Sequence, residues 1–477
     1  MRPAAFLVLA GMTLVLGLTA VALLVSDVGK GRVQEELERI RAEGGPVTLE
    51  DVGLGGAGRQ AAEWDKIAAL SEKIKTVEKE LPAVDLATMK PAGPGIARVR
   101  SRELFSFPPE TIPKEFRDSM EKMRGMLEEV SLLAKTSEVG FIPDYRQGFA
   151  AKMPHVQAMI SLTKARGKSA MAHVSSGEVD AALRDLKEGR RLKQWLLQRN
   201  TIVEGLVDMS CDNLLLGASW EILQRPGLTD LQLAELAGIW EETLEPGDIL
   251  SFWQRERVCS WQTVSNIGRK DRSGISVDFS SEESRKRVVG KVTSGIYQAF
   301  FMQNDLQHYL EFFHRLEKEL LEWKRTEKFA SLKAESARQE RFLGNLAKWE
   351  LPRYYICILA LPSTGKALET SAVIITQQRQ LKAALALQRY RLAHSRYPES
   401  LSLLVPQYLP AVPRDPLDGQ PLRYRMEKDG TYLLYSVGIN GQDDEGSGEE
   451  NIPVKRGERW RPSNCRDILW LQPQQKR

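Results

Sequence analysis

The stretch that decides the fold lies near the end of the chain. It reads Leu387-Gln-Arg-Tyr-Arg-Leu-Ala-His-Ser-Arg-Tyr-Pro398, then Asp415-Pro-Leu-Asp-Gly-Gln-Pro-Leu-Arg-Tyr424, then Tyr435-Ser-Val-Gly-Ile-Asn-Gly-Gln-Asp-Asp444. Upstream of the first segment, one apolar stripe recurs at spacings of seven, four and seven: Ile374, Leu381, Leu385 and Leu392. That periodicity predicts an amphipathic helix over 368–393. Pro398 prevents its continuation and can begin a short helix that runs to Val405.

Two short strands follow this helix. The runs 422–426 and 431–435 alternate in polarity, and Lys428-Asp429-Gly430 joins them. An Asp-Gly pair between alternating runs is a strong hairpin signal, because glycine accepts the backbone angles that the tight turn requires. Asp418-Gly419 supplies an earlier tight turn. The ending therefore predicts a helix followed by a small antiparallel sheet.

The order of these elements resembles the C-terminal half of the major pseudopilin of type II secretion. The resemblance covers roughly residues 368 to 470 and is carried by Arg396, Tyr397, Pro398, Asp415, Pro416, Gly419, Pro421, Tyr424, Ser436, Gly438 and Gly441. It implies a pseudopilin-like α+β module with a short antiparallel sheet over 366–477. The whole chain is also similar to long, singly anchored proteins of planctomycete-type bacteria whose function is unknown. That wider similarity rests on 39–48 and on the residues around Gly177.

The acidic loop of this module carries the candidate metal ligands. The pseudopilin loop binds calcium, so the resemblance implies a calcium site here, with Asn440 at the place of the family's first loop Asp. Asp467-Ile-Leu-Trp470 matches a later Asp-Ile-x-x-Trp. The candidate calcium ligands are Asn440, Asp443, Asp444 and Asp467. Closely spaced carboxylates suit a hard cation, but Asn440 removes a charge and the spacing differs from an EF-hand. A solvated acidic loop is the alternative.

The N-terminus predicts the compartment. Ala4 to Val25 contains no charged residue, and a run of about 20 apolar residues is long enough to cross a bilayer as a helix. We therefore expect a transmembrane anchor over 1–30 and a single-pass protein whose bulk is extracytoplasmic, in the periplasm. A cleaved signal peptide ending at Ala20-Val21-Ala22 is the alternative; it would leave Leu23-Leu24-Val25 at the new terminus. Leu16 occupies the position at which pilins have a Glu, so this segment differs from the N-terminus of a pilin.

The residues between anchor and ending predict a mainly α fold. We expect juxtamembrane helices over 31–80, a Pro-rich loop over 81–115 and an α-helical domain, a hairpin or bundle, over 116–365. Thr48 and Asp51 resemble the cap of a second juxtamembrane helix. A long helix is indicated by the stripe Leu306, Tyr309, Leu310, Phe313, Leu316, Leu320 and Trp323. Another begins at Thr229 with a capping box closed by Gln232.

A paired-helix pattern surrounds Gly177. The segments 170–177 and 179–186 read as helix, glycine turn, helix, which is how tetratricopeptide-like hairpins read. One unit without a fixed period supports a helical hairpin as readily as a repeat array. Repeat arrays need three or more stacked units.

Composition and motifs exclude several classes of protein. The 477 residues carry 67 basic and 63 acidic side chains, so no electrostatic argument for nucleic acid follows. The four cysteines, Cys211, Cys259, Cys357 and Cys465, are too far apart for a zinc ribbon or a Cys-x-x-Cys pair; either disulfides or free buried thiols fit them. His308 and His314 are six residues apart, on different faces of one helix. No hydrolase elbow, zincin or phosphate-loop motif occurs.

These observations predict a membrane-anchored structural or interaction protein rather than an enzyme. The sequence identifies no catalytic residue, no cofactor other than the candidate calcium ion, and no small-molecule substrate. A tetratricopeptide-like scaffold that binds a protein partner is a second hypothesis. An enzyme whose site lies in the helical middle is a third.

Overall fold

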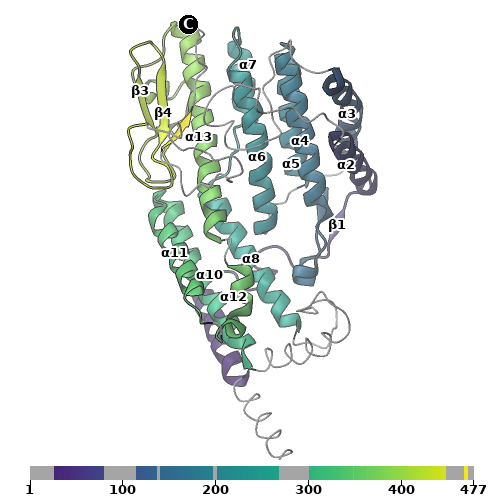
Figure 1. The fold of residues 1–477 in the computed structure, drawn as a ribbon, viewed down its shortest axis with the longest axis vertical. Coiled ribbons are helices and arrows are strands. Elements are labelled where there is room, and N and C mark those ends of the chain that lie inside the picture. Colours follow the sequence, from purple (N-terminus) through teal and green to yellow (C-terminus); the bar gives the residue numbers. More distant parts are fainter. Residues whose placement is uncertain are drawn as a thin grey trace, which may run out of the picture.

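The protein is mainly helical and ends in a small antiparallel sheet of three strands. The computed structural model describes residues 26–79, 114–136, 140–196, 201–267, 300–347, 349–361, 364–446 and 467–470. Helices stand side by side across the upper part of Figure 1, and a second group of helices extends downward from them. The fold class expected from the sequence is confirmed at this level.

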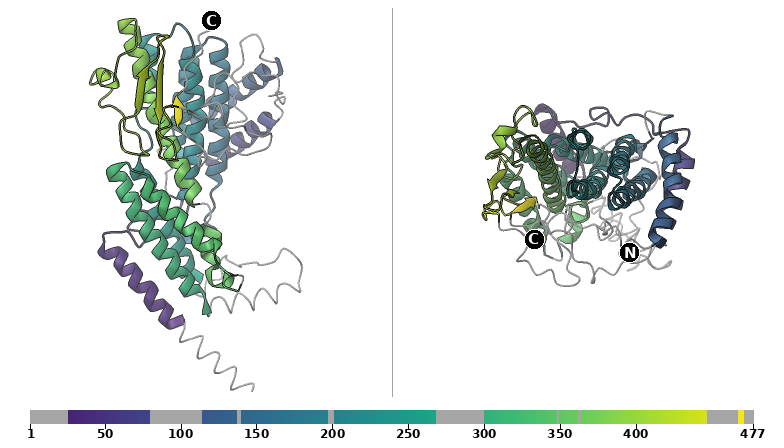
Figure 2. Two further views of the ribbon diagram at one scale, coloured as in Figure 1. Left: turned by 60° about the vertical axis from the view of Figure 1, so that its left-hand side comes forward. Right: turned by 90° about the horizontal axis from the view of Figure 1, so that it is seen from above.

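Paired helices follow one another in the upper part of the molecule. They are α2 (Trp64–Lys79) with α3 (Lys114–Leu133) and α4 (Pro154–Ser175) with α5 (Val179–Leu196); α6 (Ile202–Leu223) and the shorter α7 (Asp230–Ile239) follow these two pairs. Helix α4 packs against both α2 and α6, and α5 packs against α7. The view from above in Figure 2 shows this succession from α3 to the sheet. Stacking of helical pairs on their neighbours is the arrangement of helical repeat proteins.

The turn between α4 and α5 confirms the predicted hairpin. Gly177 adopts a φ of +79°, which glycine accepts without a steric penalty. In the following helix, α5, the side chains of Leu183 and Leu186 are buried. The predicted capping box at Thr229 is also present, with reciprocal hydrogen bonds between Thr229 and Gln232. Local sequence signals therefore set these two helix boundaries.

A second group of helices forms the lower part of the molecule. It contains the helical residues 26–42 together with α8 (Pro246–Ile267), α10 (Met302–Thr326), α11 (Ala330–Gly344) and α12 (Tyr355–Ala360). The predicted stripe of α10 is buried in full, from Leu306 to Trp323. Val33, Leu37 and Ile40 of the N-terminal helix enter the same core. An apolar face at helical spacing is thus what holds this group together.

Helix α13 (Thr364–His394) joins the two groups. Its first half, including Leu368 and Ile375, belongs to the core of α8 and α10. Its second half, including Leu381 and Leu385, belongs to the core shared by α6, α7 and the sheet. The helix predicted over 368–393 is confirmed and begins four residues earlier, but its amphipathic character is wrong, because residues 371–381 are all buried and Leu392 of the predicted stripe is 52% exposed. A single straight helix therefore contributes to two hydrophobic cores.

The C-terminal sheet packs on α13 with strand order β3-β4-β5. The strands are β3 (Arg423–Met426), β4 (Tyr432–Ser436) and β5 (Ile468–Trp470). The hairpin of β3 and β4 was predicted and is confirmed, with Tyr424 opposite Leu434. Strand β5 was not predicted; Trp470 stands opposite Leu434 as part of the sheet. The short helix expected after Pro398 is reduced to the 3₁₀ turn η4 (Leu401–Leu404).

Other expectations from the sequence concern residues that the structure does not describe, and one further expectation is wrong. The predicted anchor at 4–25, the Pro-rich segment up to Pro113, and Cys465 lie outside the described residues. Thr48 and Asp51 do exchange the expected hydrogen bonds, but they close a turn rather than begin a helix, so that expectation was wrong. The helices that the structure describes include none with both the length and the apolar character needed to cross a membrane. The remaining short elements are β1 (Arg59–Gln60), β2 (Phe141–Ile142), η2 (Tyr145–Ala150) and η3 (Leu351–Tyr354).

Candidate functional site

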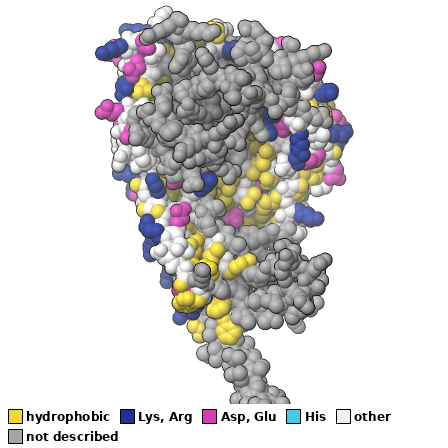
Figure 3. Space-filling model, viewed as in Figure 1, with side chains coloured by type: hydrophobic (Ala, Val, Ile, Leu, Met, Phe, Trp, Pro, Cys, Tyr) yellow, Lys and Arg dark blue, Asp and Glu magenta, His cyan; other side chains and the backbone are white. Residues whose placement is uncertain are grey.

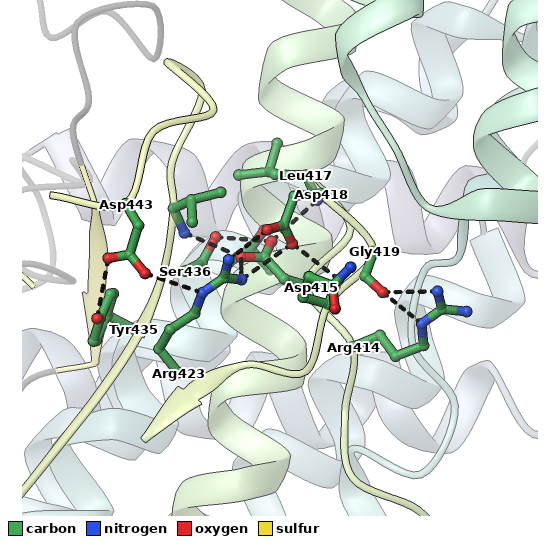
Figure 4. A network of polar contacts seen from close by, with 12 residues as sticks. Arg414, Asp415, Leu417, Asp418, Gly419, Arg423, Tyr435, Ser436 and Asp443 are labelled. Atoms are coloured by element: carbon green, nitrogen blue, oxygen red, sulfur yellow. Dashed lines mark hydrogen bonds and ion pairs between the residues drawn. The ribbon is translucent and has the colours of Figure 1, made fainter. Parts of the chain in front are cut away.

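The C-terminal module, from Asp415 through the three-stranded sheet, is organised around the carboxylate of Asp415. This side chain is 0% exposed. It accepts hydrogen bonds from the backbone N–H of Leu417 at 3.0 Å and of Val437 at 3.0 Å, and from the hydroxyl of Ser436 at 2.9 Å. Arg423 donates a further bond at 3.2 Å from Nη1. One carboxylate thus connects the Asp-Pro turn to the end of β4 (Figure 4).

Arg423 is the cation of this network. Its guanidinium pairs with Asp418, and its Nε lies 3.6 Å from a carboxylate oxygen of Asp443. Asp443 also accepts the hydroxyl of Tyr435 at 3.1 Å. Three carboxylates, those of Asp415, Asp418 and Asp443, therefore surround one guanidinium (Figure 4). This arrangement, which we call the Asp415 network, carries an excess of negative charge.

Burial and pairing move the pKa values of these carboxyls apart. Burial raises the pKa of Asp415 to about 6, although the N–H groups of Leu417 and Val437 oppose that rise. Burial also acts to raise the pKa of Asp418, but the hydrogen bonds from Arg423 and from the Gln420 N–H, together with the charge of Arg423, outweigh it and lower the pKa. Desolvation penalises a charged carboxyl and an adjacent cation favours it. The two acids of one turn therefore titrate in different pH ranges.

The turn that carries these acids is docked on the end of α10. Gly419 has a φ of +75°, and a Cβ there would meet the carbonyl oxygen of Thr326. The indole of Trp323 donates to the Pro416 carbonyl at 2.6 Å, and Phe329 N–H donates to the Leu417 carbonyl at 3.0 Å. The Asp-Pro-Leu-Asp-Gly motif therefore fixes the module to the helical body as well as closing its own turn.

The candidate calcium ligands lie close together along the acidic loop. Asp467, at the start of β5, accepts the backbone N–H of Asp444 at 3.2 Å and of Gly446 at 2.6 Å. Asn440 donates from Nδ2 to the Asp444 carboxylate at 2.9 Å. Burial raises the pKa of Asp467, and the charges of Asp443 and Asp444 add to that rise. The structure thus brings the four predicted residues to one loop and supplies protein partners for their oxygens.

No group of three or more His, Cys, Asp or Glu side chains within the described ranges is arranged to hold a metal ion. The hydrogen bonds of the loop use oxygens that a cation would need, because hard cations take six to eight oxygen ligands. Calcium binding at Asn440, Asp443, Asp444 and Asp467 stays a prediction.

A broad polar groove crosses the stacked helices, with a volume of about 1020 Å³. We call it the hairpin groove; it runs from the end of α3 over the start of α5 to the connection between α6 and α7. Its walls mix both signs of charge and are formed by residues that include Arg124, Glu128, Lys135, Glu178, Asp180, Arg184, Glu188 and Gln232. Arg184 and Lys135 are exposed, whereas Arg166 at its floor is buried and bonded to Asp185 at 2.6 Å.

A balanced cluster of charges is buried between α5, α6 and α13, and sequence reasoning missed it. Lys193 lies 2.8 Å from Asp208 and also contacts Asp212, while Arg190 lies 2.9 Å from Asp212. Gln378 of α13 donates to the other Asp212 oxygen at 2.7 Å. All these side chains are buried. We call them the Lys193 cluster; they connect α5, α6 and α13.

A signal for this cluster does exist in the sequence. Asp208 and Asp212 are four residues apart, and Arg190 and Lys193 are three apart. Each pair therefore lies on one face of its helix. Asp208 and Asp212 interrupt a largely apolar run, which indicates buried partners, but only the structure shows which helices meet.

A second enclosed cluster joins α4, α6 and η2. Glu204 accepts the Tyr145 hydroxyl at 2.6 Å and lies 2.8 Å from His155 Nε2. The ring of His155 is stacked on Phe141 at 5.1 Å between centroids. His155 and Glu204 are both shut off from solvent. These groups fix helix ends together, since Glu204 also closes a capping box with Thr201.

The remaining histidine and cysteine predictions have clear outcomes. His314 is buried between Glu36 and Glu43, while His308 contacts Tyr354, so the two do not form a pair. The three described cysteines are free and buried: Cys211, Cys259 and Cys357. Burial raises the pKa of Cys211 and of Cys259 to about 12. They behave as small core hydrophobes.

Comparison with family models, with curated proteins and with solved structures finds no match to this chain.

Proposed function

We propose that the protein is a membrane-anchored, extracytoplasmic interaction protein: a helical scaffold that holds a protein partner above the membrane, with the pseudopilin-like module as the end piece of its helical stack. The observation that carries this proposal is the continuity of the body. The described helical residues 26–42 follow the apolar segment 4–25 directly in the sequence, and Val33, Leu37 and Ile40 pack into the main core.

The attachment of that first helix is specific as well as apolar. Glu36 lies 2.6 Å from His314 Nδ1, and Glu43 lies 2.9 Å from His314 Nε2. Lys318 adds an ion pair to Glu43 at 2.9 Å. Because Glu36 and Glu43 both bind side chains of α10, the helix 26–42 is held on the body. An anchor over 4–25 would then be joined to the body without a flexible linker. The body would then keep one orientation relative to the membrane.

The pseudopilin-like module suits a capping role. Terminal units of stacked helical arrays cover the exposed apolar edge and present a polar outer face. Here the sheet covers α13, and Tyr432, Leu434 and Trp470 enter the core shared with α6 and α7. The hydrogen bond from Gln380 to the Ile468 carbonyl, 2.6 Å, joins β5 to α13. These contacts support a pseudopilin-like fold that has been taken over to close a helical stack.

The hairpin groove is the surface we assign to the partner. Extended grooves across stacked helical hairpins are how such scaffolds bind protein segments. A nucleic acid would require a predominantly basic groove, whereas Arg184 and Lys135 here alternate with acids such as Glu128 and Asp180. Walls of both signs suit an extended segment of a protein that carries charges of both signs.

Two experiments test the proposal. Extraction of native membranes with alkaline carbonate is expected to leave the full chain in the pellet, and a chain that appears in the supernatant would contradict the anchor.

For the partner, a photo-crosslinking amino acid replaces Arg184 in the groove or, as a matched control, exposed Arg338 on α11. A discrete adduct is expected from position 184 only, and its loss in a Lys135→Glu background would assign it to the groove. Equal adducts from both positions, or none from position 184, would refute the groove as the binding surface.

A further inference from the structure

The lower end of the body carries an exposed aromatic and aliphatic surface. Its exposed members are Val28 at 52%, Phe342 at 38%, Trp349 at 71% and Leu351 at 41%. We call these four residues the basal patch. Single exposed hydrophobic residues are ordinary on a soluble surface, but a group of them marks an interaction site. Figure 3 shows hydrophobic side chains gathered at this lower end of the molecule.

Aromatic packing holds one member of this patch, Phe342, in place. Phe342 and Tyr354 meet edge to face with 5.1 Å between ring centroids. His308 of α10 lies 5.1 Å from Tyr354 and 6.0 Å from Phe342. Edge-to-face pairs of this kind are favourable beyond the area that they bury. Tyr354 and His308 therefore support Phe342 at the surface.

The patch lies at the end of the body where the described chain begins. A Cβ on Gly29 would stand 2.5 Å from that of Gln303, so the first turn of the N-terminal helix touches the first turn of α10. Asp305, in the same turn of α10, accepts the backbone N–H groups of Ile356 and Cys357 at the start of α12. One turn of α10 thus contacts both the start of helix 26–42 and the segment that follows the patch.

The sequence places a membrane at this same end. The uncharged segment 4–25 stops three residues before Val28, a rise of about 4.5 Å if the helix continues. Exposed Arg341 and Arg353 flank the patch, and exposed Lys30 and Arg32 follow Val28. Tryptophan and tyrosine favour the headgroup level of a bilayer, and basic side chains near it are attracted to anionic lipids.

We propose that the basal patch is a second membrane contact: Trp349, Phe342 and Leu351 insert into the headgroup region beside the anchor, so the body rests on the bilayer instead of standing clear of it. This inference rests on the anchored function proposed above. It adds that the lipid surface is the occupant of the patch, and that two contacts, the anchor and the patch, fix the tilt of the body.

Quenching by brominated lipid tests this proposal on the full chain in vesicles. Trp349 is one of ten tryptophans, and brominated acyl chains quench only indoles at the bilayer. We expect the Trp349→Phe variant to lose on the order of one tenth of the total emission and with it a lipid-quenchable component present in the unsubstituted chain. A matched control moves the indole to the exposed position 231 on α7, as Leu231→Trp with Trp349→Phe. That variant is expected to restore emission without restoring quenching.

The outcomes separate the patch from the anchor. Flotation with vesicles together with a quenchable component that depends on Trp349 supports both. Flotation with equal quenching in the Trp349→Phe variant overturns the patch and leaves the anchor standing. Failure of the full chain to float overturns the anchored function and the patch with it. Quenching of the relocated tryptophan at position 231 would also overturn the assignment, since that position belongs to the stacked helices.

Discussion

Two charge clusters of this molecule use similar residues in opposite ways. The Lys193 cluster sets two cations, Arg190 and Lys193, against two buried carboxylates, Asp208 and Asp212. The Asp415 network sets a single cation, Arg423, against three carboxylates. The first is balanced and enclosed between α5, α6 and α13. The second carries excess negative charge and reaches the surface, because Asp443 is exposed.

The Lys193 cluster and the Asp415 network therefore have different structural roles. A balanced buried cluster holds helices in one register, and removing one partner leaves an uncompensated charge. An unbalanced network near the surface responds to pH, because its carboxylates repel each other unless one is protonated or paired. The Lys193 cluster therefore braces the helices internally, whereas the Asp415 network makes the stability of the C-terminal module depend on pH.

The largest effect is expected for Asp212→Ala. The substitution leaves the buried charges of Lys193 and Arg190 with Asp208 as their remaining partner in the cluster, and breaking a buried ion pair costs about 3–5 kcal/mol. Urea unfolding of the full chain, followed by circular dichroism, measures the loss. Asp230→Ala is the matched control: its pair with Arg389 is exposed, so we expect a loss below about 1 kcal/mol. Equal losses in the two variants would show that the cluster does not brace the helices.

The pH dependence of the Asp415 network comes next. Burial raises the folded-state pKa of Asp415 from 3.8 to about 6, so between these values the native protein binds more protons than the unfolded chain. The contribution of Asp415 is then complete below about pH 4 and is lost as the pH rises through 6. Two pKa units correspond to about 3 kcal/mol.

The measurement for this effect is the difference in unfolding free energy between the unsubstituted chain and Asp415→Asn, at pH 4 and at pH 7. Other titrating groups, such as Glu256 with a pKa raised to about 7 by burial, cancel in that difference. A difference that grows from pH 4 to pH 7 would reverse the assigned direction of the pKa shift.

A smaller loss is expected at neutral pH for the same Asp415→Asn variant. The side-chain amide has one oxygen in place of the carboxylate's two. It therefore cannot accept hydrogen bonds from the N–H groups of both Leu417 and Val437 while it faces Arg423. An unpaired buried N–H costs about 1–3 kcal/mol. Faster cleavage of the C-terminal module by a protease, with the helical body intact, is the expected readout. Unchanged cleavage would show that Asp415 does not hold the turn to β4.

The smallest effect is expected from calcium. A tightly bound ion would add about 2.7 kcal/mol at one hundred times its Kd. In this loop both oxygens of Asp467 already accept backbone N–H groups, so an entering ion would have to displace those bonds. We expect calcium to change the unfolding free energy by less than about 1 kcal/mol relative to chelator. A larger gain that disappears in Asp467→Asn would establish the predicted calcium site.

Local pattern predicted a large part of the fold. The stripe from Leu306 to Trp323 identified α10 because helical spacing puts these side chains on one face, and the face is buried. Asp429-Gly430 identified the β3–β4 hairpin because few residues fit its turn, and Gly430 has a φ of +79°. These signals act over a few residues, so the sequence contains them in full.

The candidate site was less accessible from sequence. Asp443, Asp444 and Asp467 could be named from a resemblance, but the central role of Asp415 was not foreseen. Its partners Ser436 and Val437 are more than twenty positions away. Strand β5 was missed because three residues carry too little alternation to be recognised as a strand. The charges of the Lys193 cluster were missed because their pairing joins three helices.

By itself, the sequence determined the helical character of the chain, the hairpin at Gly177, the strand pair near its end and the uncharged segment that precedes the body. Only the tertiary structure decided that α13 serves two cores, that the C-terminal sheet packs on α13, and that His314 of α10 contacts Glu36 of the helix 26–42. The physical reason is distance along the chain. Helix periodicity and turn chemistry act between neighbours, whereas the contact of His314 with Glu36 joins residues 278 positions apart and forms only when the whole core has packed.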